Sequence, residues 1–223
     1  MTDEVRRKLK DEKNVVSGLQ RRDWLFSGPV AKNLEIPHLS LYKNGSSEVV
    51  LPNGNVASNH YVNIREFNSV HISDLLTEGD SAFRNSGIKK EGWIIQLRDL
   101  GVSCSDAFFV VSRLQGGEEK LSKQGINITS YVQIDASFLK KYSRYPYRAI
   151  AYQQNPKEWS ENYLCEHGAL NFLDYFDPKN DQHDRSIKFL RRYKSILEIS
   201  GKLQELDIEI KKRFNTSLDQ ILD

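Results

Sequence analysis

Short apolar runs alternate with longer amphipathic stretches along the first 140 residues. The runs rich in Val, Ile, Leu and Phe predict strands at 14–18, 37–43, 106–113 and 127–135. Apolar positions at helical spacing predict helices within 22–36, 92–102 and 116–126. The run at 106–113 is apolar almost throughout, as in a strand that is covered on both faces of a parallel sheet. This alternation predicts an α/β domain with a parallel sheet flanked by helices.

Local signals add detail to this pattern. Asn53-Gly54 lies between two apolar segments and predicts a hairpin over 48–58. Residues 60–73 supply one or two further strands, and residues 1–13 predict a solvated helix or tail. Trp24, Leu25, Val30, Ala31 and Leu34 fit one helical face, on which Pro29 predicts a start, break or kink.

The pattern changes after Lys140, which divides the chain into an α/β core at 1–140 and a helical extension at 141–223. Apolar residues from Phe189 to Phe214 recur at helical spacing on both sides of Gly201, which predicts an antiparallel helical pair. The tract "KKYSRYPYRAIAYQQ" interleaves aromatic and basic residues. It either stacks a nucleotide base or packs the extension onto the core.

Composition narrows the function classes. The net charge of +2 over 223 residues gives no reason to expect nucleic acid or a membrane surface as a partner. No apolar run approaches the length of a membrane span, and the charged N-terminus does not resemble a secretion signal. Two cysteines, Cys104 and Cys165, form no disulfide framework, and the histidines lack metal-binding spacing. We therefore expect a cytoplasmic protein.

Three glycine-containing loops follow predicted strands, where ligands bind in open α/β sheets. They are "GLQRRD" at 18–23, "SDLLTEGDS" at 73–81 and "RLQGGEEKL" at 113–121. The first is basic, and the second combines an acidic strand end with a Thr/Gly/Ser turn, whose backbone N–H groups suit an anion. Together these loops indicate a phosphorylated ligand.

The same segments resemble the type I phosphoribosyltransferases, most closely the orotate phosphoribosyltransferase branch. "FFVVSRLQGGEEKLSKQGINITSYVQI" resembles a strand, Asp-Arg, Gly-Gly, helix and strand pattern of that branch. "NVVSGLQRRDWLFSGPVAKNLEIPHLSLYK" is similar to the family's first strand, pyrophosphate loop, helix and second strand. "SVHISDLLTEGDS" resembles the signature that binds phosphoribosyl diphosphate (PRPP). The resemblance covers roughly residues 14–140 and implies the family's fold, a Mg²⁺ ion that arrives with PRPP, and a homodimer.

The resemblance also implies roles for individual residues. Asp74 matches the acidic residue that contacts the ribose hydroxyls, and it is the residue we expect to serve catalysis. Arg113 matches the arginine that contacts the base, with Gly116 and Gly117 in the turn behind it. The remaining expected ligand-binding residues belong to the pyrophosphate loop, the end of the second strand and the signature: Arg21, Arg22, Lys43, Ser73, Thr77, Glu78, Gly79, Asp80 and Ser81.

The chain departs from the family pattern at several places. Ser73, Glu78, Asp80 and Ser112 replace an acidic residue, a Thr, a Gly and an Asp of the family motifs. A carboxylate about 4 Å from a bound phosphate is repulsive by about 1 kcal/mol even in water. Residues 44–59, at the place of a Lys-rich catalytic loop, contain no Lys or Arg, and only 13 residues stand where a base-binding hood is expected.

Structural explanations stand beside the functional ones. Asp74 either binds ligand or caps the turn that follows it. Glu78 and Asp80 are exposed loop residues, or they bind metal, or they replace a missing phosphate on the loop amides. Arg21 and Arg22 are surface residues or anion ligands.

Three functions follow. The first is an orotate-type phosphoribosyltransferase that transfers ribose 5-phosphate from PRPP to a nitrogenous base. The second is an inactive homologue that senses PRPP or a nucleotide. The third is a protein-interaction module.

Overall fold

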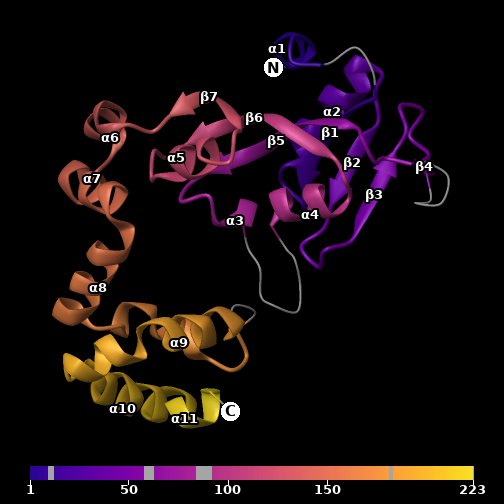
Figure 1. Ribbon diagram of the computed structural model, residues 1–223. Coiled ribbons are helices and arrows are strands. Elements are labelled where there is room, and N and C mark those ends of the chain that lie inside the picture. The colour runs from indigo at the N-terminus through magenta and orange to yellow at the C-terminus, as the bar shows by residue number, and fades with distance from the viewer. Residues whose placement is uncertain (10–12, 58–62, 84–91, 181–182, 223) are drawn as a thin grey trace. The chain divides into compact units, whose positions relative to one another are not determined.

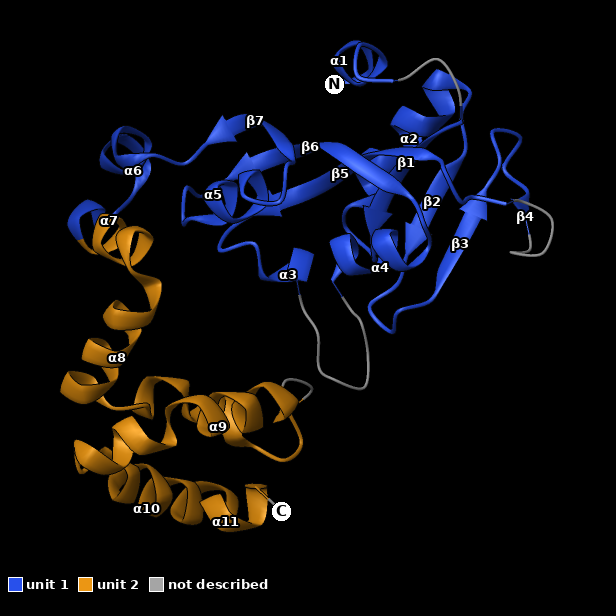
Figure 2. Ribbon diagram, viewed as in Figure 1, with its two compact units in different colours: residues 1–147 blue, residues 148–223 orange. Residues whose placement is uncertain are grey.

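The computed structural model describes residues 1–9, 13–57, 63–83, 92–180 and 183–222. Figures 1 and 2 show two compact units, an α/β unit over Met1–Tyr147 and a helical unit over Arg148–Asp223. Within the described ranges, no helix has the length and apolarity needed to cross a bilayer.

The α/β unit is built on a seven-stranded sheet of order β4-β3-β2-β1-β5-β6-β7. The strands are β1 Asn14–Leu19, β2 His38–Leu41, β3 Ser47–Val50, β4 Val56–Ala57, β5 Asn68–Leu76, β6 Ser103–Ser112 and β7 Asn127–Gln133. β2, β1, β5, β6 and β7 pair in parallel, and β3 and β4 add an antiparallel edge. The predicted α/β class is confirmed, as is the hairpin, where Gly54 adopts a positive φ of 86°.

Helices cover both faces of this sheet (Figure 1). They are α1 Thr2–Arg6, α2 Trp24–Leu34, α3 Asp80–Phe83, α4 Trp93–Asp99 and α5 Gly117–Ser122, and α6 Ala136–Tyr142 follows the last strand without buried residues. Val16 of β1 packs with α1 and α2 on one face, whereas Val15 and Leu19 pack with α4 and α5 on the other. Because successive side chains point to opposite faces, a strand between two helical layers needs apolar residues at nearly every position.

Three local expectations need correction. Leu25, expected on the packed face of α2, is 72% exposed, because the face that meets the sheet carries Ser27, Val30 and Ala31. Pro29, which predicted a start, break or kink, lies inside α2 and therefore neither starts nor breaks this helix. The N-terminus is not a solvated tail over its described part, since Val5 of α1 is fully buried against the sheet.

The helical unit has its own core. Its elements are α8 Pro156–His167, η1 Leu170–Phe176, α9 His183–Ile199, α10 Lys202–Phe214 and α11 Leu218–Leu222, and α7 Pro146–Gln154 spans the boundary between the units. Leu190 and Leu197 of α9 and Leu206 and Ile210 of α10 are fully buried in one cluster. The predicted helical pair is confirmed, and it is joined at Gly201, whose φ is 70°.

Candidate functional site

The candidate site lies at the carboxyl ends of three adjacent parallel strands. The order β2-β1-β5 brings together three segments that are far apart in the sequence. A cavity of about 660 Å³ opens there between the residues after β1, after β2 and after β5. This is the edge of a parallel sheet at which α/β proteins bind ligands.

Most of the predicted ligand-binding residues line this cavity. Its lining comprises Leu19, Gln20, Arg21, Arg22, Asp23, Lys43, Ser73, Asp74, Leu75, Thr77, Asp80 and Ser81. Five predicted residues do not line it: Glu78, Gly79, Arg113, Gly116 and Gly117. Three cationic side chains and two exposed or half-buried carboxylates therefore face one polar space.

Three hydrogen bonds fix the loop after β1. Gln20 donates its backbone N–H to Leu41 of β2 at 2.8 Å, and its side-chain oxygen accepts from the Lys43 N–H at 3.3 Å. Trp24, at the start of α2, donates its indole N–H to the Gly18 carbonyl at 2.9 Å. The Gln20–Arg21 peptide bond is cis. Arg21 and Arg22 consequently stand on an anchored turn, with exposed side chains at the cavity.

Arg22 and Asp74 form an ion pair across the cavity, with 2.9 Å between Nε and Oδ2. Arg22 is exposed, so this pair contributes little to stability, and a ligand can compete for it. The pair holds the guanidinium next to the end of β5. A ligand with an anionic group and several hydroxyl groups would then meet the Arg22 guanidinium and the Asp74 carboxylate side by side.

Asp23 joins the ends of β1 and β5. Its Oδ1 accepts from the Ser73 hydroxyl at 3.0 Å and from the Asp74 N–H at 2.9 Å, and its Oδ2 accepts from the Leu19 N–H at 3.2 Å. The side chain is 7% exposed. One carboxyl group thus sets the spacing of the two strand ends that flank the cavity.

Burial raises the pKa of Asp23 to about 7, although hydrogen bonds from Asp74 and Ser73 oppose this shift. Sequence reasoning missed Asp23, because a loop acid directly after two arginines looks like one more surface charge. Its one available signal was its position directly before the helical pattern at Trp24, where Asp is a usual N-cap residue. The side chain makes no cap hydrogen bond and bonds the strand ends instead.

The loop after β5 turns sharply at Gly79, whose φ is 79°. A residue with a Cβ is strained in this region, which explains Gly at this position. Asp80 then begins α3, lines the cavity and lies 3.7 Å from Lys120 Nζ. Glu78 does not line the cavity. Of the two carboxylates that depart from the family pattern, Asp80 faces the predicted phosphate position, and Lys120 partly neutralises its charge.

The loop after β6 supports the β5 loop. Gly117 donates its N–H to the Thr77 carbonyl at 3.0 Å. A Cβ at Gly117 would overlap the Thr77 carbonyl and come within 2.7 Å of the Leu76 side chain. Ser112, which stands in place of an Asp, is hydrogen-bonded to Glu118. The glycine pair therefore permits close packing of two loops, and Arg113 stands outside the cavity lining.

Buried polar groups lie in the strands behind the site. His71 of β5 shares a hydrogen bond of 3.0 Å with Ser17 of β1 and stacks on Trp93 at 3.9 Å between ring centroids. His38 of β2 shares a hydrogen bond of 2.8 Å with Ser27 of α2. Burial lowers the pKa of His71 to about 3 and that of His38 to about 4. Both rings are neutral near pH 7; His71 links β5 to β1, and His38 links β2 to α2.

A dedicated metal cage is absent from the part of the chain that the structure describes, where no three His, Cys, Asp or Glu side chains converge. Asp74 and Asp80 both line the cavity. Mg²⁺ usually binds through one or two carboxylates together with the phosphates of its substrate. Of the two, Asp74 would be the carboxylate that holds a Mg²⁺ ion arriving with a diphosphate.

No family model matches the chain. Among curated proteins, the adenine phosphoribosyltransferase of Shigella flexneri is 30% identical over 123 residues, which span 52% of this chain and 63% of the relative. The enzyme of the same name from Pseudoalteromonas translucida is 28% identical over 127 residues, 54% of this chain and 67% of the relative. The chain thus spans less than two thirds of the length of the Shigella relative.

Solved structures give a similar result. The adenine phosphoribosyltransferase of Thermoanaerobacter pseudethanolicus aligns with a TM-score of 0.41 at 19% identity, covering 59% of this chain and 77% of that one. Orotate phosphoribosyltransferase of Aeropyrum pernix aligns with a TM-score of 0.39 at 22% identity, over 57% and 62%. UMP synthase of Leishmania donovani gives 0.48 at 18%, over 68% and 31%. Enzymes named for adenine and for orotate both occur among these structures.

Proposed function

We propose that the α/β unit binds PRPP or a related phosphorylated ribose and, when active, transfers ribose 5-phosphate to a nitrogenous base. The observation that carries this proposal is the shared cavity. The residues that line one space of about 660 Å³ come from segments after β1 and β2 and from the end of β5 and its loop: Arg21, Arg22, Lys43, Asp74, Thr77, Asp80 and Ser81. Curated relatives named adenine phosphoribosyltransferase match about half of the chain, which supports the same reaction class.

The chemistry assigned to this chain is mainly electrostatic. Arg21, Arg22 and Lys43 face the space in which a departing diphosphate would gain negative charge, and fixed cations lower the energy of such a transition state. Asp74, which is 20% exposed, would accept hydrogen bonds from ribose hydroxyls. Mg²⁺ bound with the diphosphate would add charge stabilisation beside Asp74.

Two nitrogenous bases, orotate and adenine, are candidates for the acceptor. The sequence pattern favours orotate, whereas the curated relatives act, by name, on adenine. Arg113, the residue expected to contact a base, follows β6 and does not line the cavity. We therefore propose a base site beside the cavity, towards the loop after β6.

A second function, binding without turnover, is favoured by one specific observation. Asp80 lines the cavity where a phosphate is expected, and its repulsion weakens the binding of a dianion. Residues 44–57, which include β3 and β4, supply no cationic side chain. A PRPP or nucleotide sensor is the corresponding role.

Pyrophosphate release tests the proposal. The full chain is incubated with PRPP and Mg²⁺ and with either orotate or adenine, and Asp74→Asn serves as the matched variant. Release that depends on one base and falls at least tenfold in Asp74→Asn supports transfer. PRPP binding without release for either base supports the sensor, and release that is equal in the variant contradicts the role of Asp74.

A further inference from the structure

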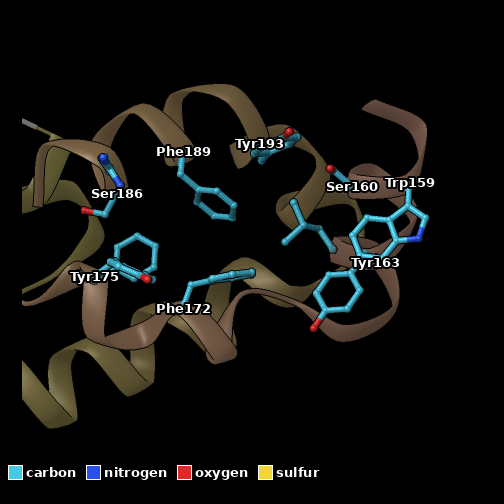
Figure 3. Close-up of a pocket in the computed structure, with 11 residues that line it drawn as sticks. Trp159, Ser160, Tyr163, Phe172, Tyr175, Ser186, Phe189 and Tyr193 are labelled. Carbon is cyan, nitrogen blue, oxygen red and sulfur yellow. The ribbon is translucent and has the colours of Figure 1, made fainter. Parts of the chain in front are cut away.

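The helical unit contains a second cavity, separate from the α/β unit. Its volume is about 370 Å³, and α8, η1 and α9 form its walls. The lining residues are Trp159, Ser160, Tyr163, Leu164, Phe172, Tyr175, Phe176, Arg185, Ser186, Phe189 and Tyr193. Figure 3 shows Phe172 and Tyr175 on one side, Phe189 and Tyr193 on the other, and Trp159 with Tyr163 at one end.

Aromatic rings dominate this cavity. Trp159 and Tyr163 stack with 5.2 Å between centroids and 14° between planes, and Phe189 lies 5.9 Å from Phe172. Phe172 and Tyr175 remain 38% and 42% exposed. Several half-exposed rings around one open hollow are costly in water and usually mark a binding site. Ring walls of this kind favour a flat aromatic group, which stacks on their faces or meets their edges.

The size of the cavity limits the ligand. Small-molecule sites range from about 300 to 1,000 Å³ and bury most of the ligand surface. At about 370 Å³, this cavity is at the lower end of that range. It suits a ligand of one or two fused rings rather than a long chain or a whole dinucleotide.

The positive charge in the cavity lining indicates which aromatic ligands would bind. Among the described residues that line the cavity, Arg185 is the one charged residue and none is a carboxylate. It lies in the first turn of α9, where the helix dipole adds positive potential, and Asp184 of the same turn does not line the cavity. The Ser186 and Ser160 hydroxyls donate to the carbonyls of His183 and Pro156. The cavity therefore combines flat apolar walls with a guanidinium, which suits a carboxylate, sulfonate or phosphate group.

We propose that this cavity binds a planar aromatic anion. The ring system packs in the hollow against the aromatic side chains that line it, and its acidic group binds Arg185. The proposal is independent of the function proposed for the α/β unit, since every residue it uses belongs to the helical unit.

The proposal is tested by calorimetric titration of the full chain with two probes, 2-naphthoate and 2-naphthamide. They share the same rings and differ by one negative charge. A hydrogen-bonded ion pair in a partly enclosed site predicts that naphthoate binds roughly tenfold more tightly than the amide. Arg185→Gln should remove this preference. Arg191→Gln, an exposed arginine of the same helix outside the lining, should keep it.

A second variant separates binding from folding. Phe172 is 38% exposed, so Phe172→Ala should leave the fold intact, as judged by thermal unfolding, and weaken both probes several-fold. The proposal is overturned if neither probe binds at millimolar concentration, or if Arg185→Gln and Arg191→Gln behave alike. It is also overturned if the cavity is occupied by a second copy of the chain, seen as a dimer that Phe172→Ala dissociates.

Discussion

The two units hold cavities of opposite character. In the α/β unit, loops at the ends of β1, β2 and β5 surround a polar cavity lined by three cations and by carboxylates. In the helical unit, the packed faces of α8, η1 and α9 surround an aromatic cavity with one cation. Backbone loops held by a sheet place charges where an anion can be surrounded, whereas helix faces mainly offer side-chain walls. We therefore expect a substitution in the lining of one cavity to change ligand affinity in that cavity alone.

The largest effect is expected for Arg22→Ala. Arg22 lines the polar cavity and is exposed, so its loss removes a charged contact without disturbing the core. Charged hydrogen bonds contribute about 1.5–3 kcal/mol, which predicts roughly a 10- to 100-fold weaker affinity for PRPP. Calorimetry measures it, with Arg6→Ala on α1 as the exposed control. Unchanged PRPP affinity in Arg22→Ala, or weaker naphthoate binding, would break the separation of the two cavities.

The next effect is expected for Gly117→Ala. The new Cβ would overlap the Thr77 carbonyl, so the β5 loop has to shift. Overpacking of this kind costs about 1–3 kcal/mol of unfolding free energy and should also weaken PRPP binding. Gly28→Ala is the control, because its Cβ meets nothing within 4 Å inside helix α2. Equal stability of the two variants in urea would show that the loops do not pack as described.

A third prediction concerns pH and Asp23. Its pKa of about 7 in the folded state exceeds the value of about 3.9 in an unfolded chain. Its contribution to stability is therefore fully present below about pH 4 and is lost as the pH rises through 7. Buried His38 and His71 act in the opposite sense, since their folded pKa values of about 4 and 3 favour folding above about pH 6.5. The pH dependence of wild-type stability therefore combines the contribution of Asp23 with the opposite contribution of the two histidines.

Asp23→Asn isolates the carboxyl group. The difference in unfolding free energy between wild type and variant should decline by about 3 kcal/mol between pH 4.5 and pH 8. Urea unfolding at several pH values measures this difference. A difference that stays flat or grows with pH would mean that Asp23 is ionised throughout and stabilised by its donors Leu19, Ser73 and Asp74.

The smallest effect is expected for Asp80→Asn. Removing a carboxylate that faces the phosphate position relieves about 1 kcal/mol of repulsion, which predicts roughly fivefold tighter PRPP binding. Glu78→Gln is the matched control, because Glu78 does not line the cavity and should change affinity less. Weaker binding in Asp80→Asn would instead indicate that Asp80 contacts the ligand through a cation.

Much of the fold could be predicted from the sequence, because strand and helix periods are local. The alternation from Asn14 to Gln133 specified parallel strands, and Asn53-Gly54 specified the hairpin. The polar cavity was also accessible, since strand ends of a parallel sheet meet at one edge and the loop residues could be named. Asp23 was not, because its role depends on strand spacing that only the folded chain defines.

The aromatic cavity was beyond sequence reasoning for a related reason. Phe189 and Tyr193 recur at helical spacing and read as core residues, and they do border the buried cluster around Leu190. Whether such residues close a core or leave a hollow depends on how three helices cross. The prediction for Leu25 was wrong for the same reason: Leu25 does lie in the predicted helix, but on the side of the helix that points to solvent.

The most direct test of the central claim is calorimetric titration of the full chain with PRPP, with and without Mg²⁺. The three cations that line the polar cavity predict micromolar binding that strengthens when Mg²⁺ is present. Absence of heat at millimolar PRPP under both conditions would contradict the claim that the α/β unit is a site for phosphorylated ribose.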